Sequence, residues 1–374
     1  MKQNMDATIK TEKGGHYYWL DLIRFLAAFA VMACHFRGAF FQEYSLLPEE
    51  QHTLGVFSFY FITRLGFEAV LIFFVLSGFL VGGRAIVRLR QGTFRARDYA
   101  IDRFARIMLP LVAALLFYLP ICLYMGKSID IADWIGSLLS LQGIVTSAPI
   151  ATLWSLSYEV WFYIIIFSLA LIWTANGRRR KYYIGLSILV VCMLVFVKLK
   201  VSYLWAWLLG AVILQTDFNL SDGKRKALCW ITLMVSMCLI VLLQVSSESR
   251  FLSVSIIDDT NLLRDLIIVL FGASFAVFIK TVIGIVPKSK AMVSLNTAGT
   301  KLAAFSYTLY LVHAPVLKLL EYLGAPKSAT VNIVSVSLYI AWLAVGMAVS
   351  YLLYYLFERN TPQLKRFLKK RLCK

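Results

Sequence analysis

Charged residues are scarce in this chain of 374 residues. Asp, Glu, Lys and Arg make up 16% of it, and 60% of the residues are hydrophobic. A soluble domain usually carries about 25% charged and about 45–50% apolar residues. Apolar stretches of about 20 residues, the length that crosses a bilayer as a helix, recur from Tyr17 to Phe357. The shortage of charge therefore argues against an ordinary soluble enzyme and predicts one helical membrane domain over residues 1–374.

Cysteine is also sparse, and its spacing is uninformative. The six cysteines form no C-x-x-C pair. All but Cys373 lie in apolar stretches, where buried free thiols are ordinary. Neither a disulfide framework nor a metal site is predicted. A cleavable signal peptide is not predicted either, because the first apolar stretch is long and no small-residue cleavage site follows it.

The apolar stretches predict an all-α, polytopic bundle of about ten transmembrane helices. The predicted spans are 17–41, 56–82, 107–126, 152–174, 182–197, 201–216, 228–244, 264–285, 305–323 and 331–357. The fifth and sixth spans are short, so a tight re-entrant hairpin around Lys198–Lys200 remains an alternative. Together the spans form a core over 17–357, followed by a basic tail over 358–374.

Basic residues outnumber acidic ones, 38 to 20, and they are unevenly distributed. Most of them fall in the segments expected on one side of the membrane, and several acids occupy the opposite loops. This alternation follows the positive-inside rule and predicts that both termini are cytoplasmic. The positive charge is spread over every inside segment instead of forming one patch, which argues against nucleic-acid binding. These basic residues are better explained as setting the membrane topology and contacting lipid. Segment 84–106 contains seven arginines and is predicted to form an interfacial amphipathic helix.

Ionisable residues within the first span indicate a polar interior, because such residues are costly in lipid. Arg24 and His35 are eleven residues apart, which places them on one helix face about 16 Å apart. A cation and an imidazole on one stripe indicate a polar cavity. The alternative is that Asp21 merely pairs with Arg24 near the surface while His35 makes a lone buried hydrogen bond.

Other spans carry similar residues. Arg64 and Glu68 have the i,i+4 spacing of a self-neutralising pair. Gly78 and Gly82 follow them as a small-xxx-small packing face. Glu159 has no basic residue one turn away, so it needs a cation from another helix or a raised pKa.

These groups suggest chemistry on an anionic ligand. His35 and Glu159 could supply a base and its orienting or proton-accepting partner. Arg103 and Arg106 enter the third span from the cytoplasmic side and suit a phosphorylated donor, since guanidinium groups bind phosphate bidentately. His313, by itself, is better explained as a helix-packing residue. The residues alone do not separate a reaction from transport.

Five motifs in order carry a resemblance. They are LDLIRFLAAFAVMACH (20–35), GFEAVLIFFVLSGFL (66–80), RFARIMLP (103–110), TLWSLSYEVWFY (152–163) and SYTLYLVHAP (306–315). Together they resemble the family of bacterial membrane acyltransferases called acyltransferase family three. Ala69 and Leu71 stand where many members have Gly and Asp, so no catalytic role is assigned to position 71, and Glu68 is its candidate replacement.

The resemblance implies an O-acyltransferase that moves acetyl from acetyl-CoA, without a metal, to a hydroxyl of a cell-envelope sugar or lipid-linked glycan. It implies a multi-pass protein of the bacterial inner membrane. It makes His35 the catalytic base or acyl carrier, Arg24 and Glu159 its catalytic companions, and Arg103 and Arg106 donor-binding residues, with Arg64 as a further donor-binding candidate. Further candidates in the motifs are Asp21, Glu68, Ser77, Tyr158, Tyr310 and His313.

Two rival functions follow from the same residues. A proton-coupled transporter of an envelope precursor could use the buried His and Glu, but the chain lacks the repeated halves of many transporters. A structural subunit would give Arg24, His35 and Glu159 no reason to be buried. Membrane lipids are expected partners, and a homo-oligomer is left open.

Overall fold

The computed structural model describes residues 17–245, 261–285, 287, 289–325 and 327–372. It is 80% helical, with no β-strand in these residues, which confirms the predicted all-α class. Within the same residues, seven helices are long and apolar enough to cross a membrane, and eight if one bent pair is counted as a span. The predicted count of ten is therefore not confirmed.

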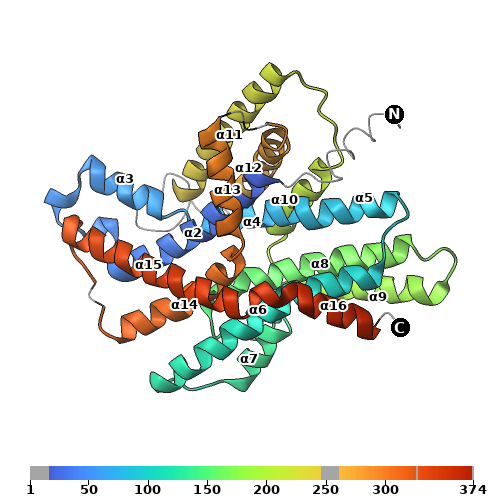
Figure 1. Ribbon diagram of the computed structural model, residues 1–374, viewed down its shortest axis with the longest axis horizontal. Coiled ribbons are helices and arrows are strands. Elements are labelled where there is room, and N and C mark those ends of the chain that lie inside the picture. The colour runs from blue at the N-terminus through green and yellow to red at the C-terminus, as the bar shows by residue number, and fades with distance from the viewer. Residues whose placement is uncertain (1–16, 246–260, 286, 288, 326, 373–374) are drawn as a thin grey trace.

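Four of the seven long segments precede residue 174. They are α2 (Tyr18–Phe40), the segment Leu54–Arg90, α6 (Ala96–Tyr124) and Ala151–Trp173, which contains α8 (Trp154–Trp173). A short amphipathic helix, α7 (Ile131–Leu138), lies between α6 and α8. Figure 1 shows α2 running through the middle of the molecule, where it packs against α13, α14 and α15 as well as the second segment.

Three long segments and the bent pair lie in the second half. The long segments are α11 (Asp222–Val245), α12 (Asn261–Val282) and Ile333–Leu372, which contains α15 (Ile333–Leu356) and α16 (Thr361–Leu372). The bent pair is α13 (Lys290–Ala303) and α14 (Ser306–Tyr322), which meet at 57°. This bend brings α14 alongside α2, while α13 packs across its start.

The second segment is broken into pieces instead of forming one straight span. It contains α3 (Leu54–Thr63), α4 (Gly66–Ser77), a π-helical stretch η3 (Gly78–Gly83) and α5 (Arg84–Arg90). The prediction of one amphipathic helix over 84–106 was wrong. The α5 helix ends at Arg90, and Gly92 adopts a left-handed conformation with φ +67°. Such a residue terminates a helix, so the chain restarts as α6 at Ala96.

The short segment over 182–216 forms α9 (Arg179–Val195) and α10 (Val201–Ile213). Thirteen residues make a helix of about 20 Å, which is shorter than a hydrocarbon core of about 30 Å. The α10 helix packs against α4, η3 and α12. A Cβ on Gly78 would lie 1.9 Å from the carbonyl oxygen of Trp207. The predicted small-residue packing face is thus confirmed, with α10 as its partner.

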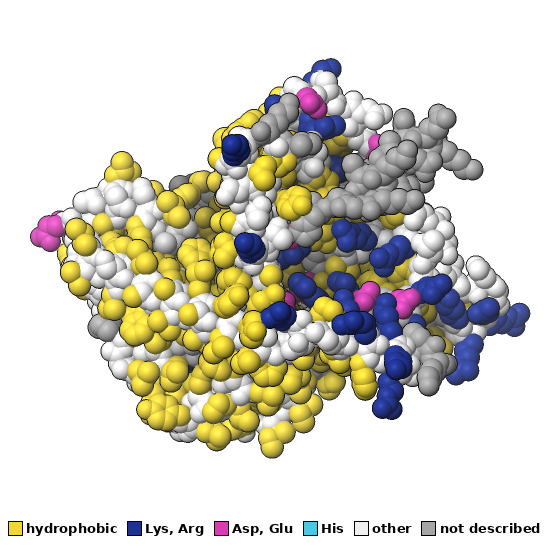
Figure 2. Space-filling model, in the orientation of Figure 1, with side chains coloured by type: hydrophobic (Ala, Val, Ile, Leu, Met, Phe, Trp, Pro, Cys, Tyr) yellow, Lys and Arg dark blue, Asp and Glu magenta, His cyan; other side chains and the backbone are white. Residues whose placement is uncertain are grey.

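Basic and apolar surfaces separate toward different ends of the molecule. Figure 2 shows Lys and Arg gathered toward one side, where Figure 1 places α16 and the outer ends of α5 and α9. Large hydrophobic side chains are exposed elsewhere, among them Leu194, Trp230 and Tyr355. Exposed apolar surface on this scale is what a membrane protein presents to lipid.

Candidate functional site

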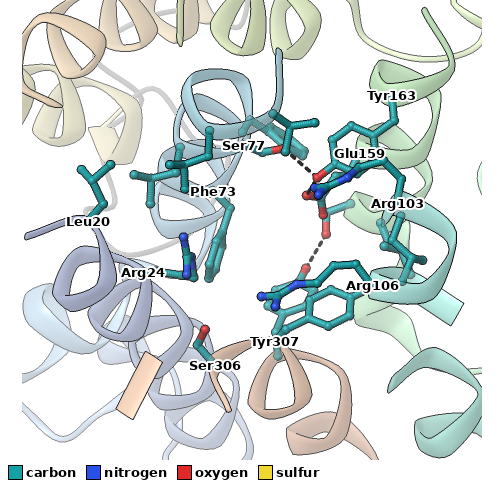
Figure 3. A pocket seen from close by; sticks show the side chains of 18 of the residues that line it. Leu20, Arg24, Phe73, Ser77, Arg103, Arg106, Glu159, Tyr163, Ser306 and Tyr307 are labelled. Atoms are coloured by element: carbon teal, nitrogen blue, oxygen red, sulfur yellow. Dashed lines mark hydrogen bonds between the residues drawn. The ribbon is translucent and has the colours of Figure 1, made fainter. Parts of the chain in front are cut away.

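A cavity of about 440 Å³ opens between α2, α4, η3, α5, α6, α8, α14 and α16. Five basic side chains line it: Arg24, Arg84, Arg103, Arg106 and Lys365. Two acidic side chains, Asp21 and Glu159, also line it. Figure 3 shows Arg24 and Arg106 approaching it from opposite walls. Basic side chains thus outnumber acidic ones in the lining, which suits an anionic ligand.

The first helix contributes a charged pair to this cavity. The guanidinium of Arg24 lies 3.3 Å from the carboxylate of Asp21. This is the pair that the i,i+3 spacing offered as the alternative to a cavity-lining role. Arg24 nevertheless remains a lining residue, with 24% of its side chain exposed. Pairing and cavity lining are therefore compatible at this position.

Glu159 belongs to a chain of hydrogen bonds on the opposite wall. The hydroxyl of Tyr163 donates to Glu159, and Ser77 Oγ lies 3.0 Å from the Tyr163 oxygen. Trp207 Nε1 donates to Ser77 Oγ at 3.2 Å. The single hydroxyl hydrogen of Tyr163 is donated to Glu159, so Tyr163 accepts in its bond with Ser77. Ser77 therefore donates to Tyr163 and accepts from the Trp207 N–H. The carboxylate is thereby fixed in one orientation.

Arg103 and Arg106 come from the first turns of α6. The Arg103 guanidinium lies 5.6 Å from the centre of the Tyr163 ring. The Arg106 guanidinium lies 3.9 Å from the carboxylate of Glu358, a residue that sequence analysis did not single out. Glu358 is buried and accepts hydrogen bonds from Thr308 N (3.2 Å) and Thr308 Oγ1 (2.6 Å). One buried carboxylate therefore links Arg106 to the start of α14.

Sequence analysis also did not single out four residues that line the cavity. Arg84, Lys365, Tyr163 and Tyr307 all line the cavity. The hydroxyl of Tyr307 is buried and has no hydrogen-bond partner among the described residues. Lys365 pairs with Asp102 at 3.5 Å, which docks α16 on α6. Of the residues that sequence analysis missed, only Glu358 carried a recognisable signal: it is an acidic residue at the end of the last apolar stretch, next to the basic tail.

His35 lies outside the lining of this cavity and is exposed. Its Nδ1 lies 2.8 Å from Nε2 of His313, and the two rings are nearly parallel, with centroids 5.1 Å apart. The interpretation of His313 as only a packing residue was therefore incomplete. The idea that Glu159 orients His35 was wrong, because Glu159 accepts from Tyr163 and His35 bonds to His313.

Tyr310 connects the cavity with the histidine pair. It lines the cavity, donates to the carbonyl of Thr152 at 3.0 Å, and its hydroxyl lies 2.6 Å from that of Ser155. Its ring also packs edge-on against His313, with centroids 6.0 Å apart. Three residues of helix rise about 4.5 Å, so the cavity wall and His313 are one turn apart.

The remaining predicted residues lie away from the cavity lining. The backbone carbonyl oxygen of Arg64 lies 3.6 Å from Sγ of Cys34. Glu68 is buried, and its Oε2 has no hydrogen-bond partner among the described residues. Tyr158 is buried and accepts from Lys200 N at 3.0 Å. The structure brings together Asp21, Arg24, Ser77, Arg103, Arg106, Glu159 and Tyr310.

Comparison with known protein families identifies a domain that covers most of the chain. Residues 17–355 match the sequence profile of an acyltransferase domain, acyltransferase family 3. No curated protein and no solved structure matches the chain.

Proposed function

Since the chain belongs to acyltransferase family 3, a family of membrane acyltransferases, we propose that it transfers acetyl from acetyl-CoA to a hydroxyl of a cell-envelope sugar. The acceptors we propose are units of O-antigen, capsule or exopolysaccharide. The observation that carries the proposal is the arrangement just described. A cavity rich in arginine ends one helical turn from the buried His313, whose hydrogen-bond partner His35 is exposed.

The cavity suits the donor. Coenzyme A carries a pyrophosphate and a further phosphate, and guanidinium groups bind phosphate with paired hydrogen bonds. Arg24, Arg103 and Arg106 would hold these groups at the basic side, which we assign to the cytoplasm of the bacterial inner membrane. The unpartnered hydroxyl of Tyr307 would supply one more hydrogen bond. The acyl-bearing arm would then extend past Tyr310 toward the histidines.

His35 would act on the acceptor. It takes the proton of the acceptor hydroxyl while that oxygen attacks the thioester carbonyl carbon. The carbon–sulfur bond breaks, and the proton passes from His35 to the leaving thiolate. The products are the acetyl ester and free coenzyme A. Because His35 is exposed outside the donor cavity, acceptor and donor approach it from different directions.

The test measures ester-linked acetate in envelope polysaccharide from a strain whose only copy of the chain is a variant. We expect His35→Ala and Arg24→Ala to abolish acetylation at normal protein levels. The matched controls are His52→Ala and Arg88→Ala, at exposed positions outside the cavity lining, which should retain it. Wild-type acetate with His35→Ala would refute the proposal. A chain that moves an unmodified precursor and leaves acetyl-CoA intact would be the transporter instead.

A further inference from the structure

His313 uses both of its ring nitrogens, although it is fully buried. Its Nδ1 lies 2.9 Å from the carbonyl oxygen of Leu309, one turn earlier on α14. Its Nε2 lies 2.8 Å from Nδ1 of His35. Three groups on two helices thus form one continuous chain of hydrogen bonds, ending at the exposed ring of His35.

When both rings are neutral, the direction of every hydrogen bond in this chain is fixed. A carbonyl oxygen only accepts, so the proton of His313 is on Nδ1. A neutral imidazole has one donor and one acceptor, so Nε2 of His313 accepts. His35 must then donate from Nδ1. Its Nε2 is left without a proton, and it has no hydrogen-bond partner among the described residues.

The opposite arrangement would need a charged His313. Its Nε2 would then carry a proton, His35 Nδ1 would accept it, and the outer nitrogen of His35 would be protonated. Burial of an imidazolium is costly unless an anion pairs with it. The hydrogen-bond partners of His313 are a neutral carbonyl and a second imidazole. The neutral chain is therefore favoured.

We infer that His313 is a positioning residue that holds His35 in the tautomer protonated at Nδ1, so that the Nε2 lone pair faces the acceptor hydroxyl. This rests on the proposed function. When Nε2 takes the acceptor proton, the imidazolium of His35 still donates from Nδ1 to His313. His313 thus both selects the tautomer before the reaction and stabilises the charge formed during it.

The consequence is a sharp difference between two substitutions. In His313→Gln, the amide oxygen can take the place of Nε2 and accept from His35. In His313→Met, the volume is similar but the strong acceptor is lost. We expect His313→Gln to keep kcat within about 5-fold, and His313→Met to lower it by about 100-fold or more, in the range of general-base catalysis. The KM for acetyl-CoA should stay unchanged in both.

The deciding experiment reads the tautomer directly. The chain has four histidines, so nitrogen-15 spectra of histidine-labelled protein in detergent can be assigned with single variants. We expect His35 to be protonated at Nδ1 and bare at Nε2 in the wild type. We expect a mixture of tautomers in His313→Met, with wild-type behaviour in His313→Gln.

Three outcomes would overturn the inference. They are a His35 protonated at Nε2 in the wild type, full kcat in His313→Met, or equal loss in folded His313→Gln and His313→Met. Thermal unfolding of each variant identifies losses that come from misfolding. The spectra need no acyl transfer, so they decide the tautomer even if acetyl transfer by the wild type is not observed, an outcome that would count against the proposed function alone.

Discussion

Replacement of Gly78 by alanine tests the close packing of η3 on α10. The added Cβ would meet the Trp207 carbonyl oxygen at 1.9 Å, whereas ordinary contact begins at 3.4 Å. The two backbones must separate by about 1.5 Å, the difference between these distances. Overpacking costs about 1–3 kcal/mol, and loss of the Trp207–Ser77 hydrogen bond adds about 1 kcal/mol. We expect a total destabilisation of about 2–4 kcal/mol.

The assay is thermal unfolding of the detergent-purified protein, followed by size-exclusion chromatography after heating. Gly38→Ala is the matched control, because nothing lies within 4 Å of a Cβ there. Alanine in that helix should be neutral or stabilise by up to about 1 kcal/mol. If Gly78→Ala unfolds at the wild-type temperature, or if Gly38→Ala loses as much, the argument from close packing fails.

Three further predictions concern charged residues around the cavity. Arg106→Lys should raise the KM for acetyl-CoA by about 10-fold or more with less effect on kcat, since Lys lacks the bidentate fork; Arg88→Lys in the same kinetic assay should change neither. Glu358→Ala should lower the unfolding free energy by about 1–3 kcal/mol, because Thr308 N loses its buried acceptor, while Glu358→Gln should retain most of it in the same unfolding assay. Lys369→Ala removes a half-exposed ion pair with Asp98, whose charged atoms are 3.2 Å apart. It should lower the unfolding free energy by less than about 1 kcal/mol in the same assay, and a larger loss would contradict this assessment of the α16 contact.

The features that could be predicted from the sequence are those that depend on residues close together along the chain. Hydropathy predicted the helical class, and the i,i+3 spacing of Asp21 and Arg24 offered their pair as an alternative that the structure shows. The spacing of Gly78 and Gly82 gave a packing face, and the structure supplied α10 as its partner.

The sequence could not predict partners from distant helices. His313 is 278 residues from His35, and Glu358 lies 252 residues after Arg106, so no periodicity relates them. The i,i+4 reasoning for Arg64 and Glu68 assumed a straight helix, but the chain breaks between Thr63 and Gly66. There a Cβ on Gly66 would lie 2.9 Å from Cys34, so packing against α2 decides the path.

The single helix α2 that carries both Arg24 and His35 constrains how this chain can vary in length. One residue inserted between them would turn His35 by 100° and shift it by about 1.5 Å, which would remove it from His313. Substitutions along this stretch can be absorbed, but insertions and deletions cannot. The connection over 41–53 lies after His35 and outside any helix longer than three residues, so length changes there leave the register intact. Under the proposed function, acceptor preference could therefore diversify through outer loops while the helix between Arg24 and His35 keeps a fixed length.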